Sequence, residues 1–255
     1  DLLASRFISD GASVVTVSKD GHIVQWTTEG EVIEERRLEM EVADVVIPTE
    51  GAFVVLITSE GAVFLSSFGE ESPRELEVEI PVEGVDLMSG DELILTRDEE
   101  GIFRSFDVES GELVFERSME EPISVMGRAL TGALVAIGTK GGEIELWDLA
   151  TEERFGELSH GEDLSGLRFS SGSEYLLSWG GKMARDGYGT FRVWSTESLE
   201  EISAVHGERA FIDVDFDPLG GRVVASNGTR AVGLYDLFDG TRIESLISPY
   251  LHTGL

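Results

Sequence analysis

Apolar and polar residues alternate along this chain in a unit that recurs six times. Each unit holds an apolar strand, a tight polar turn and a second strand, and its clearest copies span residues 93–111 and 134–153. The second strand ends in an aromatic residue in five of the six units, and successive ends lie 40 to 47 residues apart. These ends are Trp26, Ser66 (where the aromatic is missing), Phe106, Trp147, Trp194 and Tyr235. The pattern predicts a repeat protein built from strands.

Each unit divides into four predicted strands, named a to d in chain order. In the fourth unit they cover residues 123–127, 133–138, 143–149 and 154–158. Strand b is apolar on both faces, which is expected of a strand buried between two sheets, whereas strand d is acidic and alternating, as at an outer edge. Strand repeats of about 40 residues are typical of β-propeller blades. We therefore predict an all-β fold, a β-propeller of six four-stranded antiparallel blades, with part of a seven-bladed or longer propeller as the alternative.

The repeats fill the chain from end to end, which predicts one propeller domain over residues 1–255. We also expect this sequence to be a segment of a longer protein. The approximate repeat boundaries are 1–40, 41–81, 82–122, 123–163, 164–209 and 210–255. Glycines at positions that favour tight turns mark the predicted a–b turns, at Gly11, Gly51, Gly90, Gly132, Gly172 and Gly220.

The strand endings point to a known family. Phe106-Asp107, Trp147-Asp148 and Tyr235-Asp236 end three c strands, and the segment 216–220 (Phe-Asp-Pro-Leu-Gly) follows an a strand. Histidines stand where a blade opens, at His160, His206 and His252. With these features in register, the chain resembles a divergent WD40-repeat β-propeller over essentially its whole length.

The resemblance implies a structural role for a set of side chains. In this family a blade-opening histidine bonds through a strand-b Ser or Thr and a turn Asp to the Trp of strand c. The first repeat offers Ser18, Asp20 and Trp26, and His252 would complete the set if six blades close into a ring. The other structural positions are Phe106, Trp147, His160, Trp194, His206 and Tyr235.

The chain is strongly acidic. Its 50 acidic and 19 basic residues give a net charge of −31, and only three of the basic residues are lysines. Nucleic acid and anionic membrane surfaces would repel such a chain, so we expect no nucleic-acid partner and no membrane insertion. Solubility of exposed strands, or adaptation to a salty cytoplasm, would each account for the charge. We expect a monomeric, cytoplasmic domain.

No motif for catalysis or metal binding stands out. The four histidines lie far apart with no paired spacing, there is no cysteine, and neither a nucleophile elbow nor a phosphate loop is present. The sequence predicts no catalytic residue, no metal site and no cofactor.

One segment breaks the repeat. Between strands b and c of the fifth repeat, residues 178–189 run about six residues longer than their counterparts and combine aromatic with cationic side chains. In the family the b–c and d–a loops share one rim, which is the usual partner-binding face. The candidate partner-binding residues on this rim are Trp179, Lys182, Met183, Arg185, Tyr188, Lys19, Lys140, Arg209 and Arg230.

Three functions remain open at this stage. The first is a non-catalytic scaffold that binds a protein or peptide, possibly another domain of its own polypeptide, through an acidic or mixed-charge segment docked on this rim. The second is a structural or sensory domain of a larger protein. The third is an enzyme acting at the central channel of a propeller. A shared fold does not decide among them.

Overall fold

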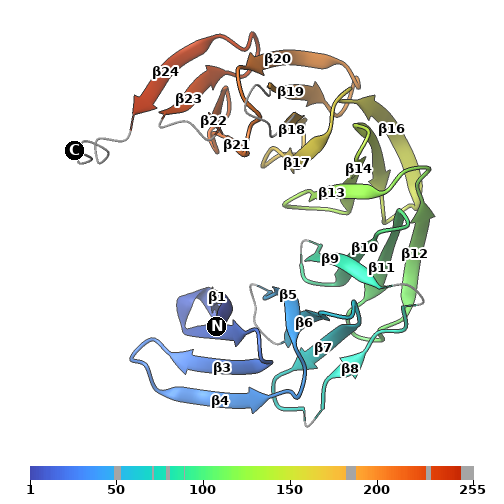
Figure 1. The fold of residues 1–255 in the computed structure, drawn as a ribbon, viewed down its shortest axis with the longest axis vertical. Helices are drawn as coiled ribbons and strands as arrows, with labels where there is room; N and C mark the ends of the chain where they lie inside the picture. Colours follow the sequence, from blue (N-terminus) through green and yellow to red (C-terminus); the bar gives the residue numbers. More distant parts are fainter. Residues whose placement is uncertain are drawn as a thin grey trace. The chain divides into compact units, whose positions relative to one another are not determined.

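The computed structural model describes residues 1–48, 53–70, 72–78, 81–88, 90–181, 188–227 and 231–247. The chain divides into two compact units, residues 1–120 and 121–255, each described here by itself. Within the described residues, six four-stranded antiparallel sheets follow one another along the chain, and we number them sheet 1 to sheet 6. In every sheet the spatial order of the strands is their order in the sequence (Figure 1).

The first unit contains sheets 1 to 3. A short 3-10 turn, η1 (Ser9–Gly11), joins the first two strands. The strands of this unit are β1 (Leu2–Ile8), β2 (Ser13–Ser18), β3 (His22–Thr27), β4 (Val32–Arg37), β5 (Val42–Val46), β6 (Phe53–Thr58), β7 (Val63–Ser67), β8 (Arg74–Glu75), β9 (Val82–Leu87), β10 (Leu93–Asp98), β11 (Ile102–Asp107) and β12 (Leu113–Ser118).

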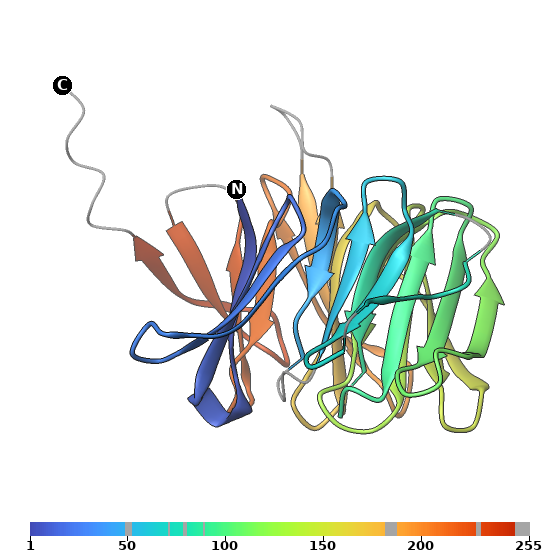
Figure 2. The same cartoon turned by 90° about the horizontal axis from the view of Figure 1, so that it is seen from below.

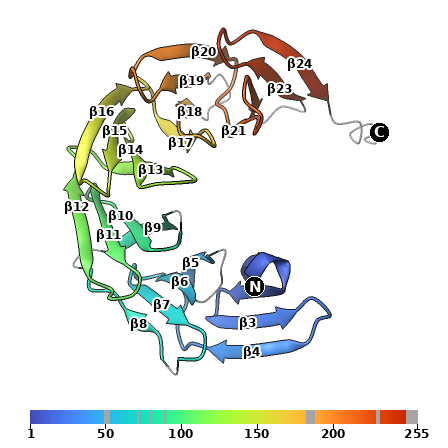
Figure 3. The ribbon, with the colours of Figure 1, turned by 180° about the vertical axis from the view of Figure 1, so that it is seen from behind.

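The second unit contains sheets 4 to 6. Sheet 5 lies beside sheet 4, and the first strands of the two sheets are in contact (Figure 3). The strands of this unit are β13 (Ile123–Arg128), β14 (Leu134–Thr139), β15 (Glu143–Asp148), β16 (Glu153–Ser159), β17 (Leu164–Phe169), β18 (Tyr175–Gly181), β19 (Gly189–Ser195), β20 (Glu201–Gly207), β21 (Asp213–Phe216), β22 (Arg222–Ser226), β23 (Ala231–Asp236) and β24 (Arg242–Ile247).

The predicted strands and turns are largely confirmed. In the fourth repeat all four predicted strands match β13 to β16 to within one or two residues. Gly132 adopts a φ of 79° in its a–b turn, a conformation that favours glycine. In sheet 5 the left-handed residue is Ser173 (φ 62°) and not the predicted Gly172. The last strand of sheet 2 is short and pairs only over Arg74–Glu75.

Apolar side chains fill the spaces between successive sheets within each unit. Strand β6 is buried over Phe53–Ile57 on both faces, as the sequence predicts for a b strand. Strand β2 in sheet 1 and strand β22 in sheet 6 differ, because buried and half-buried residues alternate along them. The first and last sheets therefore each keep one face that the described residues cover only in part.

A bulge gives five of the six sheets a common register. In five sheets the pairing of strands c and d shifts immediately before the aromatic end of strand c. Because the shift falls at the same place, the residues around it are structurally equivalent from sheet to sheet. The aromatic ends at these five bulges are Trp26, Phe106, Trp147, Trp194 and Tyr235.

The repeated sheets confirm an all-β fold. Their arrangement into a propeller, closed or open, stays a prediction, as does the interpretation of residues 1–255 as one domain.

Candidate functional site

At one end of the sheets in each unit, the b–c turns are joined to the d–a linkers, and we call this end the b–c rim of the unit. In the first unit the Leu38 and Val42 amides donate to the carbonyls of Gly21 and Lys19, at 2.9 and 2.8 Å. The strand connections of each sheet lie at the two ends of its strands (Figure 2). Each linker is thus fixed to the turn beside it, and side chains on both are held at the same end of the sheet.

The second unit has the same connections. The His160 amide donates to the Gly142 carbonyl at 2.8 Å, and the Gly181 amide to the Asp163 carbonyl at 3.0 Å. The family resemblance implied that b–c and d–a loops share a rim. Within each unit, these backbone hydrogen bonds agree with that expectation.

Four of the predicted partner-binding residues are exposed on this rim. Lys19 and Lys140 lie in b–c turns, Arg209 lies in the linker from β20 to β21, and Tyr188 precedes β19 with 47% of its surface exposed. Among the described residues, none of these four side chains has a hydrogen bond or ion pair. Lys182, Met183, Arg185 and Arg230 lie outside the described residues.

Trp179 is not a loop residue, because β18 continues to Gly181. Its side chain is 5% exposed, and the indole donates to the Ile212 carbonyl at 3.3 Å. Its ring lies directly over Gly166, where an added Cβ would come within 2.0 Å of a ring carbon. The Arg168 guanidinium lies 5.8 Å from the ring centroid. Trp179 is a core residue, so the placement of residues 178–181 in an exposed loop was wrong.

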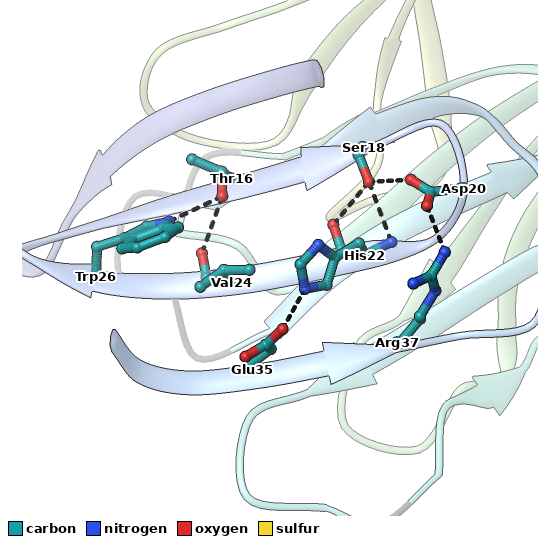
Figure 4. A network of polar contacts seen from close by, with 8 residues as sticks. All are labelled: Thr16, Ser18, Asp20, His22, Val24, Trp26, Glu35 and Arg37. Carbon is teal, nitrogen blue, oxygen red and sulfur yellow. Dashed lines mark hydrogen bonds and ion pairs between the residues drawn. The ribbon is translucent and has the colours of Figure 1, made fainter. Parts of the chain in front are cut away.

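The predicted polar set of sheet 1 forms differently from expectation (Figure 4). The Trp26 indole donates to Thr16 Oγ1 at 2.9 Å, and not to Ser18. Ser18 instead donates to Asp20 Oδ1 at 2.6 Å, and Arg37 donates to Asp20 Oδ2 at 2.9 Å. The hydrogen bond from the Ser18 hydroxyl is the largest of the effects that lower the pKa of Asp20. His252, the expected fourth member, lies outside the described residues.

Sheet 5 joins two residues of the predicted set, His160 and Trp194, through a serine of its strand b. The Trp194 indole donates to Ser178 Oγ at 2.8 Å, and His160 Nδ1 is hydrogen-bonded to the same oxygen at 2.8 Å. His160 is fully buried, and its Nε2 has no hydrogen-bond partner in the described part of the chain. Burial, and then the neighbouring Arg192, lower the pKa of His160 from 6.5 to about 4.

The other aromatic ends are held in different ways. The Trp147 indole donates to Glu145 Oε2 at 2.8 Å. Phe106 is buried but has no polar group to donate. Tyr235 packs edge-on against Phe191, with ring centroids 5.2 Å apart. His206 is hydrogen-bonded to Thr190 at 3.2 Å, within its own sheet, and among the described residues it has no hydrogen bond to strand b of sheet 6.

A cavity of about 590 Å³ opens between β20 and sheet 6, both in the second unit, and we call it the sheet 6 groove. Its lining includes His206, Arg209, Tyr235 and Arg242, with Glu208 as its one carboxylate among the described residues. The sequence interpretation selected the first three separately and missed Arg242. A signal for this groove is present in the sequence. When the repeats are aligned on their aromatic ends, Gly233 stands where three other repeats carry a charged residue.

The described residues contain no group of three or more His, Cys, Asp or Glu that would hold a metal ion. Asp213 and Asp215 both pair with Arg168, at 3.5 and 2.8 Å. In the part of the chain that the structure describes, no helix is long and apolar enough to cross a membrane.

Comparison with known proteins gives distant relatives. No protein-family model matches the chain. It is 23% identical to human "Cilia- and flagella-associated protein 52" over 212 residues, which are 80% of this chain and 33% of that protein. It is 24% identical to the mouse protein of the same name over 184 residues, 69% of this chain and 29% of that protein. The chain therefore spans about a third of the length of the curated relatives it matches.

A solved structure supports the fold. The computationally designed protein Ika8 superposes with a TM-score of 0.75 at 17% identity, over 96% of this chain and 74% of that protein. At this identity the likeness concerns the fold alone. The resemblance to WD40 repeats is consistent with these findings and stays a prediction.

Proposed function

We propose that this chain is a non-catalytic protein-interaction module of the WD40 type, whose six sheets are blades of a propeller and whose b–c rim binds a protein or peptide. The observation that carries the proposal is that exposed side chains lie on the b–c rim of each unit, Lys19 on the first and Lys140, Tyr188 and Arg209 on the second. The turns and linkers that bear three of them are fixed to neighbouring backbone. These side chains have no hydrogen bond or ion pair among the described residues. A binding protein would therefore not have to break such a contact in order to reach them.

The distant relatives support this reading in a coarse way. Their name associates them with cilia and flagella, and we extend that association to this chain as part of the proposal. Because the chain covers a third of their length, a structural or sensory domain within a longer polypeptide is the second candidate. A partner in that case is another segment of the same protein.

The test is affinity capture from a ciliated cell extract with the whole chain. The rim variant combines Lys19→Glu, Lys140→Glu, Tyr188→Ala and Arg209→Glu. The control changes three exposed apolar residues on a–b and c–d turns of the second unit, Leu130→Ala, Leu219→Ala and Phe238→Ala. We expect the rim variant to lose a specific partner that the control keeps. A partner lost only from the control would overturn the assignment of the rim.

A further inference from the structure

The sheet 6 groove results from one missing side chain. Two residues before the aromatic end, strand c carries a charged residue in three sheets, namely Arg104, Glu145 and Arg192. Each of them pairs with a residue of strand d in its own sheet, at Glu116, Arg154 and Glu201 respectively. The equivalent residue of sheet 6 is Gly233, so no such side chain occupies this position.

Sheet 4 shows what the position holds when it is filled. Glu145 accepts a hydrogen bond from the Trp147 indole at 2.8 Å and pairs with Arg154 at 3.0 Å. Arg154 lies directly opposite Trp147 in the ladder. One buried carboxylate thus joins the aromatic end of strand c to the arginine of strand d.

Sheet 6 keeps both partners of that carboxylate and lacks the carboxylate itself. Arg242 lies directly opposite Tyr235, in the register that Arg154 has to Trp147. The Tyr235 ring lies over Gly233, with its Cε2 2.4 Å and its hydroxyl 2.5 Å from the place where a Cβ on Gly233 would stand. The structure gives the Tyr235 hydroxyl no hydrogen bond among the described residues, and the Arg242 guanidinium bonds Ser245 Oγ at 2.8 Å.

The charge around the groove agrees with an anionic occupant. The chain carries a net charge of −31, yet two arginines, Arg209 and Arg242, line this cavity against one carboxylate among the described residues, Glu208. Arg209 is exposed and has no ion pair among the described residues. An arginine guanidinium and a phenol hydroxyl both donate strong, charge-assisted hydrogen bonds to a carboxylate.

We propose that the sheet 6 groove binds a glutamate or aspartate side chain of a partner peptide. The carboxylate binds beside Gly233, over which the Tyr235 ring lies, and is held between the Tyr235 hydroxyl and Arg242, with Arg209 at the entrance. This inference rests on the proposed function, because it names the chemistry of the partner that the module recognises.

The test measures binding of a fluorescein-labelled octapeptide of alternating glutamate and alanine to the whole chain by fluorescence anisotropy. The test variant is Arg209→Glu with Arg242→Glu. The control is Arg128→Glu with Arg222→Glu, beside the a–b turns at the opposite ends of the strands, which makes the same change in net charge. We expect a dissociation constant below about 1 mM, a loss of about tenfold or more in the test variant, and a change within about twofold in the control.

A second variant supplies the missing group from the chain itself. Gly233→Glu places a carboxylate beside Arg242, at the cost of turning the Tyr235 ring aside, and is expected to abolish peptide binding. Equal binding of the glutamine counterpart of the peptide, equal loss in the control variant, or no binding by the wild-type chain each overturns the proposal. Capture can also yield a partner that depends on the rim residues and still binds the Arg242→Glu variant equally well. That result would overturn the groove proposal and leave the proposed interaction module standing.

Discussion

The most informative prediction concerns one hydroxyl that occurs at equivalent places in two sheets of the first unit. Thr16 in sheet 1 and Thr96 in sheet 3 each lie two residues beyond the residue that pairs with the aromatic end of strand c. Thr16 Oγ1 accepts the Trp26 indole N–H at 2.9 Å. Thr96 lies next to Phe106, which has no donor. Its side chain is fully buried and its Oγ1 has no partner among the described residues.

The same substitution should therefore have opposite effects at the two positions. Thr96→Val replaces a buried, unsatisfied hydroxyl by a methyl group, and we expect it to stabilise the chain by about 1 kcal/mol. Thr16→Val leaves the Trp26 indole without its acceptor and should destabilise by about 1 kcal/mol. The assay is chemical unfolding of the whole chain, with midpoints compared at unchanged slope. Both threonines lie in the same unit, so the two variants report on the same packed region.

A third substitution tests the reason for the difference. Phe106→Trp supplies an indole N–H to Thr96, so Thr96→Val should become destabilising in that background. The interaction free energy from this double-mutant cycle is expected to be about 1 kcal/mol or more. Destabilisation by Thr96→Val in the wild-type background, as large as that by Thr16→Val, would refute the reasoning.

Three further predictions follow from single sites. His160 has a pKa of about 4 in the folded chain against 6.5 unfolded, so its contribution to stability is complete above pH 6.5 and is lost as the pH falls toward 4. The wild type should lose about 3 kcal/mol more than His160→Gln between pH 7 and 4 in unfolding titrations, and parallel curves would contradict this. Arg104→Met leaves Asp98, buried and 2.8 Å from the guanidinium, without its counter-charge. It should cost about 3–5 kcal/mol in the same assay, and a cost below about 1 kcal/mol would be inconsistent with a buried pair. Trp179→Ala should cost about 3–5 kcal/mol, whereas Tyr188→Ala should change stability by less than about 0.5 kcal/mol, and comparable losses would place both residues in the core.

The repeat pattern predicted the local fold well, because strand periodicity and turn glycines are local signals. The strands of the fourth repeat and the buried β6 follow directly from alternation and apolar runs. Trp179 was assigned to a loop because residues 178–189 run longer than the b–c segments of the other repeats, and Gly180 and Gly181 follow Trp179 in that segment. In the structure those glycines continue the ladder, since Gly180 faces Leu164 and Gly181 faces Gly189. Pairing with neighbouring strands overrode the local turn preference.

Side-chain partners were harder to predict, because they depend on register. Ser18 was expected beside Trp26, yet Trp26 pairs with Val14, so that Thr16 is the next residue on the same face. His206 was expected to reach the next sheet. Strand b of sheet 6 carries Ala225 where strand b of sheet 5 carries Ser178. His206 therefore has no hydroxyl on that strand with which to form a hydrogen bond. The sheet 6 groove was not predicted, because it arises from a side chain that Gly233 lacks.

The central claim is that a partner binds the b–c rim, and hydrogen–deuterium exchange tests it most directly. Amide exchange is compared between the free whole chain and its complex with a captured partner. The account predicts slower exchange in the b–c turns and d–a linkers, such as residues 19–21, 38–42, 140–142 and 207–212, because a partner seated there shields these amides. Slower exchange confined to the a–b and c–d turns at the opposite ends of the strands would contradict it.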